Sequence, residues 1–152
     1  MLSPIKNKAL IRNAAYINGQ WIASQTKGTF TISDPATGNF LGEVPHLDVQ
    51  DTESAVQAAK KAFQSWSKLD AGERAGYLKK WHRLILDNVD DLAYLLTMEQ
   101  GKPLAEAKAE IQYGASFVEW FAEEARRVYG DIIPGHQTSK RILVLRQPIG
   151  VV

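Results

Sequence analysis

The segment MEQGKPLAEAKAEIQYGASFVEWFAEEARRVYGDIIP, residues 98–134, decides the fold of this chain. Gly101 suits a left-handed C-terminal cap for the helix before it, and Pro103 suits the first turn of the helix after it. Nothing interrupts a helix over residues 104–129, and Gly130 then ends it. The segment therefore predicts a long helix, about 39 Å from end to end.

Two apolar faces make this helix central to the fold. Small and medium-sized residues recur at three- and four-residue spacing and form one stripe: Ile111, Ala115, Val118, Ala122 and Ala125. Bulky aromatic residues form a second face beside it: Tyr113, Phe117, Trp120 and Phe121. Because a helix that is apolar on much of its circumference needs partners on both sides, we expect both faces to be packed.

Short strands precede this helix in the chain. Asn18-Gly19 is typical of the turn of a β-hairpin, because both positions of a type I′ turn need a positive φ. A second pair of strands is predicted at residues 29–33 and 39–45, joined by a turn that ends at Gly38. We expect these strands to form one small antiparallel sheet.

Helices follow, predicted at residues 49–66, 71–87, 90–100 and 104–129. Asp48 and Asp70 are the expected N-caps of the first two. The tail returns to strand, and the apolar run over residues 142–145 is typical of a strand covered on both faces. Because an unfinished apolar strand is an aggregation hazard, we expect the chain to be the beginning of a longer protein.

Composition limits the function classes. The 152 residues are 45% hydrophobic and 23% charged, as in ordinary globular proteins. The net charge of +1 gives no electrostatic footprint for nucleic acid or an anionic membrane. No cysteine is present, so these residues contain neither a disulfide nor a catalytic thiol. We expect a cytoplasmic protein with no nucleic-acid and no membrane partner.

The residues alone reveal no active site. His46, His82 and His136 match no metal-ligand spacing, and no glycine-rich phosphate loop is present. Glu99 lies in the last predicted turn of a helix, where a carboxylate opposes the helix dipole. It could mark a cation site, or Lys102 could neutralise it.

Tyr113 and Phe117 lie one helical turn apart on the aromatic face. They could line an apolar tunnel, or they could be ordinary packing residues.

Several motifs carry a resemblance to a known family. EQGKP and QPIGV are typical of the aldehyde dehydrogenase superfamily, as are the INGQW hairpin and the DPATG turn. PLAEAK, SFVEWFAEE and YGDIIPGHQ are typical of a subgroup. With these motifs nearly the whole chain resembles the N-terminal part of bacterial succinate-semialdehyde dehydrogenases.

The resemblance implies a mixed α/β fold, the N-terminal portion of the aldehyde dehydrogenase fold. Residues 1–130 would be the strands and helical layer of the cofactor-binding domain, and residues 131–152 would begin an oligomerisation strand. It also implies oxidation of an aldehyde, succinic semialdehyde first, to the acid with NAD or NADP. In that family a cysteine thiolate attacks the aldehyde, hydride passes to the nicotinamide, and a glutamate activates the hydrolytic water.

None of those catalytic and cofactor-binding residues lies in this segment, so the segment alone should be inactive. Three features carry over. The resemblance implies a substrate-tunnel role for Tyr113 and Phe117, and a place near a monovalent cation for Glu99. It implies that residues 141–147 join the sheet of a neighbouring subunit, which predicts a homo-oligomer, a dimer or a tetramer. The alternative is a non-enzymatic helical module whose terminal strand pairs with a partner.

Overall fold

The computed structural model describes residues 2–23 and 28–152. Its elements, in chain order, are a short 3-10 helix η1 (Lys8–Leu10), β1 (Ala15–Ile17), β2 (Gln20–Ile22), β3 (Thr29–Ser33), β4 (Phe40–Pro45), α1 (Val49–Trp66), α2 (Ala71–Asp87), α3 (Val89–Gln100), α4 (Leu104–Glu124), β5 (Asp131–Pro134) and β6 (Arg141–Val144). This is the predicted mixed α/β arrangement, with short antiparallel strands on either side of a run of four helices.

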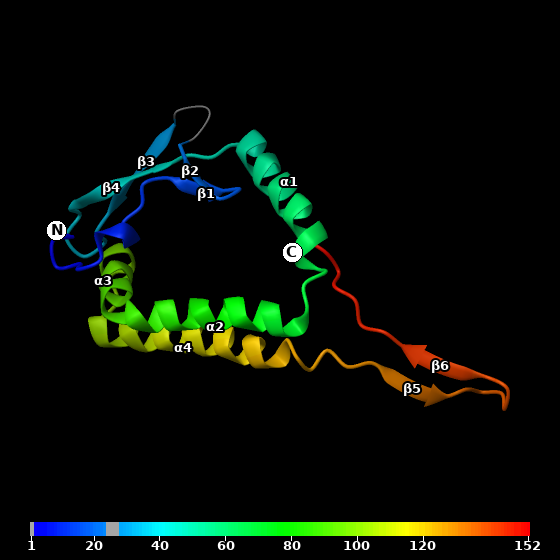
Figure 1. The fold of residues 1–152 in the computed structure, drawn as a ribbon. Helices are drawn as coiled ribbons and strands as arrows, with labels where there is room; N and C mark the ends of the chain where they lie inside the picture. Colours follow the sequence, from blue (N-terminus) through cyan, green and yellow to red (C-terminus); the bar gives the residue numbers. More distant parts are fainter. Residues whose placement is uncertain (1, 24–27) are drawn as a thin grey trace.

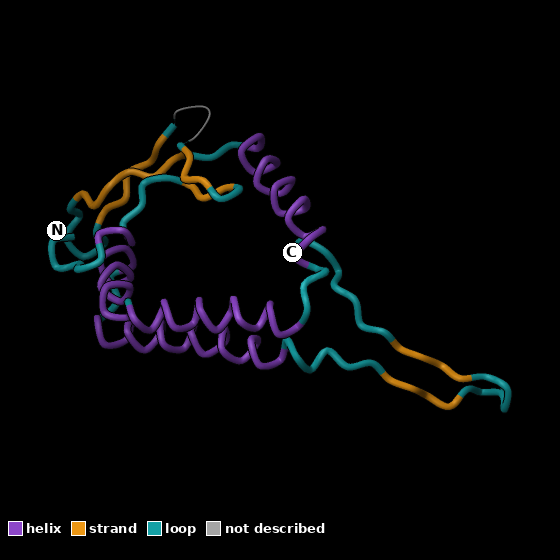
Figure 2. The backbone as a smooth tube through the Cα atoms, in the orientation of Figure 1, coloured by secondary structure: helices purple, strands orange, loops and turns teal. Residues whose placement is uncertain are grey.

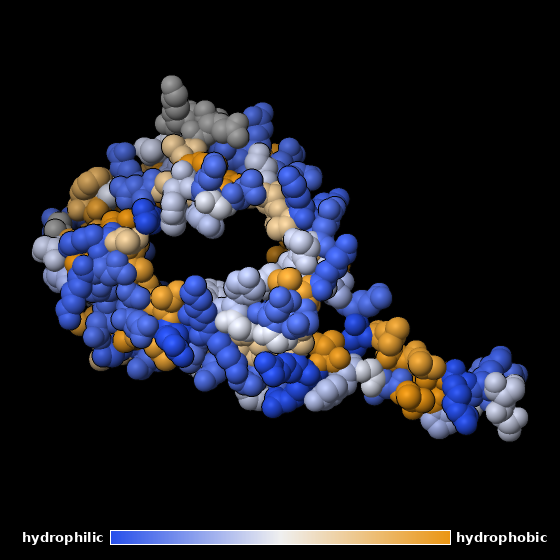
Figure 3. Space-filling view, viewed as in Figure 1, coloured by the Kyte–Doolittle hydropathy of each residue, from blue (hydrophilic) through white to orange (hydrophobic). Residues whose placement is uncertain are grey.

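The elements from η1 to α4 surround an open centre (Figure 1). Strands β1–β4 form one side of this frame, and α1 forms a second side. The antiparallel pair α2 and α4 forms the side opposite the strands, and α3 connects that side to the strands (Figure 2). The space-filling view also shows an opening there (Figure 3). Within the described residues the fully shielded apolar side chains are few and mostly small: Ile5, Ala75, Ala93, Ala107, Ala115 and Ala122.

Helix α4 holds the three-helix part of this frame together, because it packs against both α2 and α3. Its small-residue stripe provides the contact surface: Ala115 and Ala122 are buried, and Ile111, Val118 and Ala125 are half-buried. Alanine at these positions allows the helix backbones to approach closely. The prediction that this stripe is packed is confirmed.

Two ion pairs cross the outer surface of the same three helices. Lys79 Nζ of α2 lies 2.7 Å from Glu123 Oε1 of α4, and Lys108 Nζ of α4 lies 2.6 Å from Asp90 Oδ1 of α3. The hydrogen bond from the partner lysine lowers the pKa of Glu123 and of Asp90 below the ordinary values. Because all four side chains are exposed, these pairs orient the helix surfaces more than they stabilise the fold.

The helix ends follow the sequence signals closely. Asp48 begins α1 and Asp70 begins α2, and each carboxylate accepts backbone N–H groups in a capping box. Gly101, with φ of 84°, ends α3 in the left-handed conformation. The predicted bounds of α1 and α2 are confirmed, and α3 starts at Val89, one residue before its predicted start.

Helix α4 is shorter than predicted. It ends at Glu124, and the N–H groups of Arg126 and Arg127 then donate to the carbonyls three residues back, which tightens the chain into a turn. Val128 and Tyr129 follow, and β-branched and aromatic side chains lose rotamer freedom in a helix. The prediction of a helix as far as residue 129 is therefore wrong by one turn and a little more.

The early strands form two separate sheets, so the prediction of one sheet is wrong. β1 pairs only with β2 and β3 only with β4 within the described residues. Asn18 has φ of 51° and Gly19 has φ of 81°, which confirms the predicted hairpin turn. Each pair is joined by its own turn, so the hydrogen bonds between its two strands form without a strand from the other pair.

The N-terminal residues are tied to the helices. Ile5 is almost fully buried, and the backbone N–H groups of Lys6 and Asn7 donate to the Asp91 carboxylate of α3 at 3.0 and 2.7 Å. The side chain of Asn7 also donates to Asn88 Oδ1 at 2.8 Å. This segment is therefore an integral part of the frame.

The hairpin β5–β6 projects away from the frame (Figure 1). Its strands are exposed along their whole length, and apolar residues gather on its shaft while the tip is polar (Figure 3). No described residue covers its faces, so the expectation of a strand with two covered faces is wrong for this chain by itself. Among the described residues no helix is long and apolar enough to cross a membrane.

Candidate functional site

The aromatic face of α4 is open to solvent. Tyr113 is 65% exposed and Phe117 47%, and Trp120 and Phe121 are exposed as well. The expectation that this face is packed is therefore wrong for the described residues. The small-residue stripe takes up the contact with α2 and α3, so the bulky side chains point to the other side of the helix.

Tyr113 and Phe117 form an ordered pair on this face. Their ring centroids lie 4.8 Å apart at an interplanar angle of 78°, an edge-to-face contact. Helical spacing of four residues brings them together. Between them, Ser116 Oγ donates to the carbonyl of Tyr113 at 2.7 Å, so its hydroxyl is satisfied by its own helix.

A depression of about 640 Å³ extends from this pair towards the end of α4. Its apolar part is formed by the aromatic rings, and its charged rim is formed by Glu119, Glu123, Glu124 and Arg127. Arg127 hydrogen-bonds Glu124, which raises the pKa of the arginine above its ordinary value, and Glu123 is paired with Lys79. Three of these four rim charges are neutralised in pairs, with Glu119 outside them, and the rings supply the apolar surface, so the depression is suited to an apolar or aliphatic group.

Glu99 lines a different and smaller hollow, of about 190 Å³. Glu43 and Arg12 also line it, and Arg12 lies 4.9 Å over the Trp21 ring. Lys102 does not neutralise Glu99, because its ammonium pairs with Glu110 of α4. That interpretation of the sequence is wrong.

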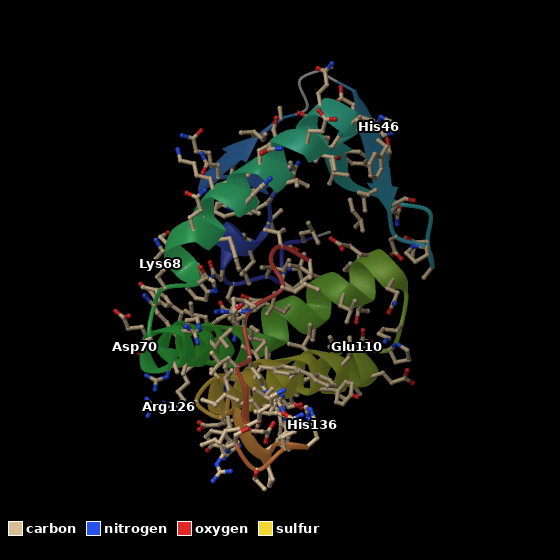
Figure 4. All side chains as sticks on the ribbon, turned by 90° about the vertical axis from the view of Figure 1, so that its right-hand side faces the viewer. His46, Lys68, Asp70, Glu110, Arg126 and His136 are labelled. Carbon is tan, nitrogen blue, oxygen red and sulfur yellow. The ribbon has the colours of Figure 1, made fainter. Side chains whose placement is uncertain are left out.

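The described residues contain no group of three or more metal-binding side chains. His46 and His136 lie at opposite ends of the side view (Figure 4). Glu99 is thus one carboxylate beside Glu43, and its assignment to a cation stays a prediction.

Two relationships escaped sequence reasoning. Asp91 falls inside the helix predicted over residues 90–100 and no pattern singles it out, yet its carboxylate accepts the backbone N–H groups of the N-terminal segment; an acidic residue in the first turn of a helix is a weak signal for this. Pro35 touches Gly101, and no local pattern indicates a contact between two turns so distant in sequence.

Comparison with known proteins identifies the family of this chain. The aldehyde dehydrogenase family matches residues 21–152. The chain is 53% identical to the glutarate-semialdehyde dehydrogenase of Pseudomonas putida and 50% identical to the succinate-semialdehyde dehydrogenase [NADP(+)] GabD of Escherichia coli, each over 97% of this chain. It spans only 31% and 30% of the length of these two relatives.

The fold is found in solved structures. The succinate-semialdehyde dehydrogenase of Burkholderia pseudomallei superposes with a TM-score of 0.93 at 51% identity, over 96% of this chain and 30% of that chain. The strands, the four helices and their order are therefore those of the N-terminal part of such enzymes. This chain belongs to the aldehyde dehydrogenase family.

Proposed function

We propose that this chain acts as part of an NAD(P)-dependent dehydrogenase that oxidises a semialdehyde, succinic semialdehyde first, to the carboxylic acid. One observation carries the proposal: the chain is about half identical, along almost its full length, to relatives named for succinate- and glutarate-semialdehyde. Both substrates are aliphatic chains with an aldehyde at one end and a carboxylate at the other. Because the chain spans about 30% of such relatives, the activity belongs to the longer protein.

The aromatic face of α4 is the proposed contribution of this chain to the substrate site. Tyr113 and Phe117 would form one wall of the tunnel that leads the aldehyde to the reacting centre. Their edge-to-face contact fixes both rings, and a rigid apolar wall excludes water and guides an aliphatic chain. Neither ring supplies acid, base or nucleophile.

The nucleophile must come from other residues of the protein, because this chain contains no cysteine. The start of helix α4 also lacks the usual features of a pyrophosphate site. A pyrophosphate is usually held by a glycine-rich turn that opens a helix, whereas α4 opens with Pro103, which has no N–H to offer, after the single glycine Gly101. NAD or NADP would therefore be bound mainly by residues outside this chain.

Two further roles are proposed. Glu99, with its carboxylate at the small hollow, would contribute to a monovalent cation site. The arm formed by residues 131–152 would be the start of the oligomerisation region of a homodimer or homotetramer, and residues 1–130 would belong to the cofactor-binding domain. The protein would work in the cytoplasm.

The second candidate, a non-enzymatic helical module that pairs through its terminal strand, is less well supported. The exposed hairpin β5–β6 agrees with it. The family match over residues 21–152 favours the enzyme.

The test is an assay of the full-length protein with succinic and glutaric semialdehyde, each with NAD+ and with NADP+. We expect reduction of at least one cofactor that depends on the aldehyde, and none with succinate in its place. Intact mass must first show that the protein assayed is longer than the 16.9 kDa of this chain. A folded full-length protein that reduces neither cofactor with either aldehyde would refute the proposal.

A further inference from the structure

We propose that residues 2–11 form a strap that closes the hollow beside Glu99, and that the Asp91 carboxylate is the latch that holds the strap in place. The inference does not depend on the dehydrogenase activity, nor on a cation at Glu99. It rests on where the N-terminal residues lie, on what holds them, and on which cavity they cover.

The strap is bound at its middle by both oxygens of one carboxylate. Asp91 Oδ1 accepts the backbone N–H of Lys6 at 3.0 Å, and Oδ2 accepts that of Asn7 at 2.7 Å. Asp91 is largely buried, and hydrogen bonds to a shielded charged group are among the stronger ones. Two consecutive amides on one carboxylate fix the position of the strap and the direction in which it runs.

Neighbouring groups complete the latch. Asn7 Nδ2 donates to Asn88 Oδ1 at 2.8 Å, at the junction of α2 and α3. Ile5 inserts next to these bonds and is almost fully buried. The strap also has internal order, because Lys8 Nζ donates to the carbonyls of Leu2 and Ser3 at 2.9 and 3.1 Å. A loosely attached terminus would show none of these features.

The strap covers one cavity. Leu2, Leu10 and Ile11 line the hollow of about 190 Å³, facing Leu95 and Glu99 of α3. The hollow thus has a wall made of the first residues of the chain, and its closure depends on a hydrogen-bonded carboxylate eight positions before Glu99. Release of the latch would expose Ile5 and open the hollow from this side.

Low pH weakens the latch. The N–H groups of Asn7 and Lys6 hold the pKa of Asp91 below its ordinary value of 3.8, and the charges of Lys6 and Lys8 act in the same sense. Asp90, the other acid beside it, is paired with Lys108. Because the pKa of Asp91 is lowered in the folded state, the latch is closed at a pH above the ordinary pKa and opens as the pH falls through the lowered pKa. The strap is therefore shut throughout the neutral range.

The test measures strap release and hollow opening separately in the full-length protein. Asp91→Asn leaves one acceptor and turns an amide NH₂ towards a backbone N–H, so amide exchange at Lys6 and Asn7 should rise about tenfold or more. The matched control is Asp90→Asn, the adjacent acid, which makes no hydrogen bond to the strap. Exchange in α2 and α4 should stay unchanged in both.

Hollow opening is read from a thiol placed in it. Leu95→Cys adds a thiol to the lining of the hollow, on α3, and peptide mapping distinguishes its maleimide labelling from that of any other thiol in the protein. In this background Asp91→Asn should raise the labelling rate by about tenfold, and Asp90→Asn should not. If Asp91→Asn does not fold, Asn7→Pro replaces it, since proline has no N–H to donate to Asp91 Oδ2 and the change leaves the sequence of α3 intact; exchange is then read at Lys6. Equal exchange and equal labelling in the latch and control variants would overturn the proposal.

Discussion

Gly101 and Pro35 lie in direct contact, although they come from turns far apart in the chain. A Cβ atom on Gly101 would lie 2.9 Å from Pro35 Cγ, and Gly101 has φ of 84°. The contact joins the turn before β4 to the junction of α3 and α4. The glycine therefore meets two demands at once, a left-handed backbone and a close approach.

Gly101→Ala should destabilise the protein by about 1–3 kcal/mol, because the new methyl group must fit both a positive φ and the Pro35 ring. Gly76→Ala is the matched control: Gly76 lies within α2 with open space around it, so the change should stabilise the protein by about 0.5–1 kcal/mol. Denaturant unfolding of both variants decides. Equal stability of the Gly101 variant and the parent would show that the Pro35 ring can move to accommodate the new methyl group at no cost in stability.

Tyr113→Ala in the full-length protein should lower kcat/KM for semialdehydes by about tenfold or more, and leave the KM for the cofactor nearly unchanged. The reason is that a tunnel wall acts on the aldehyde alone; loss of a bound aromatic contact typically costs a factor of this size. Steady-state kinetics with several aldehydes measures the effect.

Phe117→Ala should act in the same direction with a smaller effect, because Phe117 is less exposed than Tyr113. The control is Tyr77→Ala on α2, an exposed aromatic residue outside the α4 face, which should leave aldehyde selectivity alone. Unchanged kcat/KM across the aldehydes in the Tyr113 variant would remove that residue from the tunnel.

Leu143→Lys combined with Leu145→Lys should shift the protein towards smaller species in sedimentation velocity. Both side chains are exposed on the projecting arm, at 66% and 77%, and a lysine pair in an apolar strand contact carries a desolvation cost. Thr138→Lys, at the polar tip, adds charge without touching the shaft and should change nothing. A sedimentation profile that is identical for the double variant and the parent would argue against an interface on the arm.

Thr37→Val should raise the pKa of Asp34. The Thr37 hydroxyl donates to Asp34 Oδ2 at 2.7 Å and is the main reason that this pKa lies below its ordinary value; the Ala36 N–H, at 2.9 Å, adds to it. Since the pKa of Asp34 is depressed in the folded state, the turn stabilises the fold at a pH above the ordinary pKa. That contribution is lost as the pH falls through the lowered pKa. The Thr37→Val variant should therefore lose less folding stability than the parent when the pH is lowered.

A carboxyl NMR titration checks this prediction. Thr29→Val serves as the comparison, because its hydroxyl bonds Glu43 instead, at 3.3 Å. An Asp34 pKa that is the same in the Thr37 variant as in the parent would assign the shift to the backbone N–H groups alone.

Local signals predicted most of the secondary structure. Asp48, Asp70 and Gly101 marked helix ends, and Asn18-Gly19 marked the hairpin, because each needs only its own neighbours to act. The end of α4 was missed, since no strong breaker stands between Glu124 and Gly130 and weak propensities decided.

Contacts between distant segments could not be predicted in the same way. The Asp91 latch and the contact of Pro35 with Gly101 join residues whose own surroundings look ordinary. The aromatic face of α4 was expected to be packed because apolar residues usually are, yet no described element reaches Tyr113. The family motifs supplied its proposed role, which periodicity alone left open.

Packing of α4 on α2 and α3 has a consequence for the order of events during synthesis. These three helices follow one another directly along the chain, and short loops between contacting elements make chain closure fast. In relatives about three times as long as this chain, the matching helices leave the ribosome well before the rest. Pulse-labelled hydrogen exchange should find their amides protected first, which would make this helical unit the template on which later parts of the chain assemble.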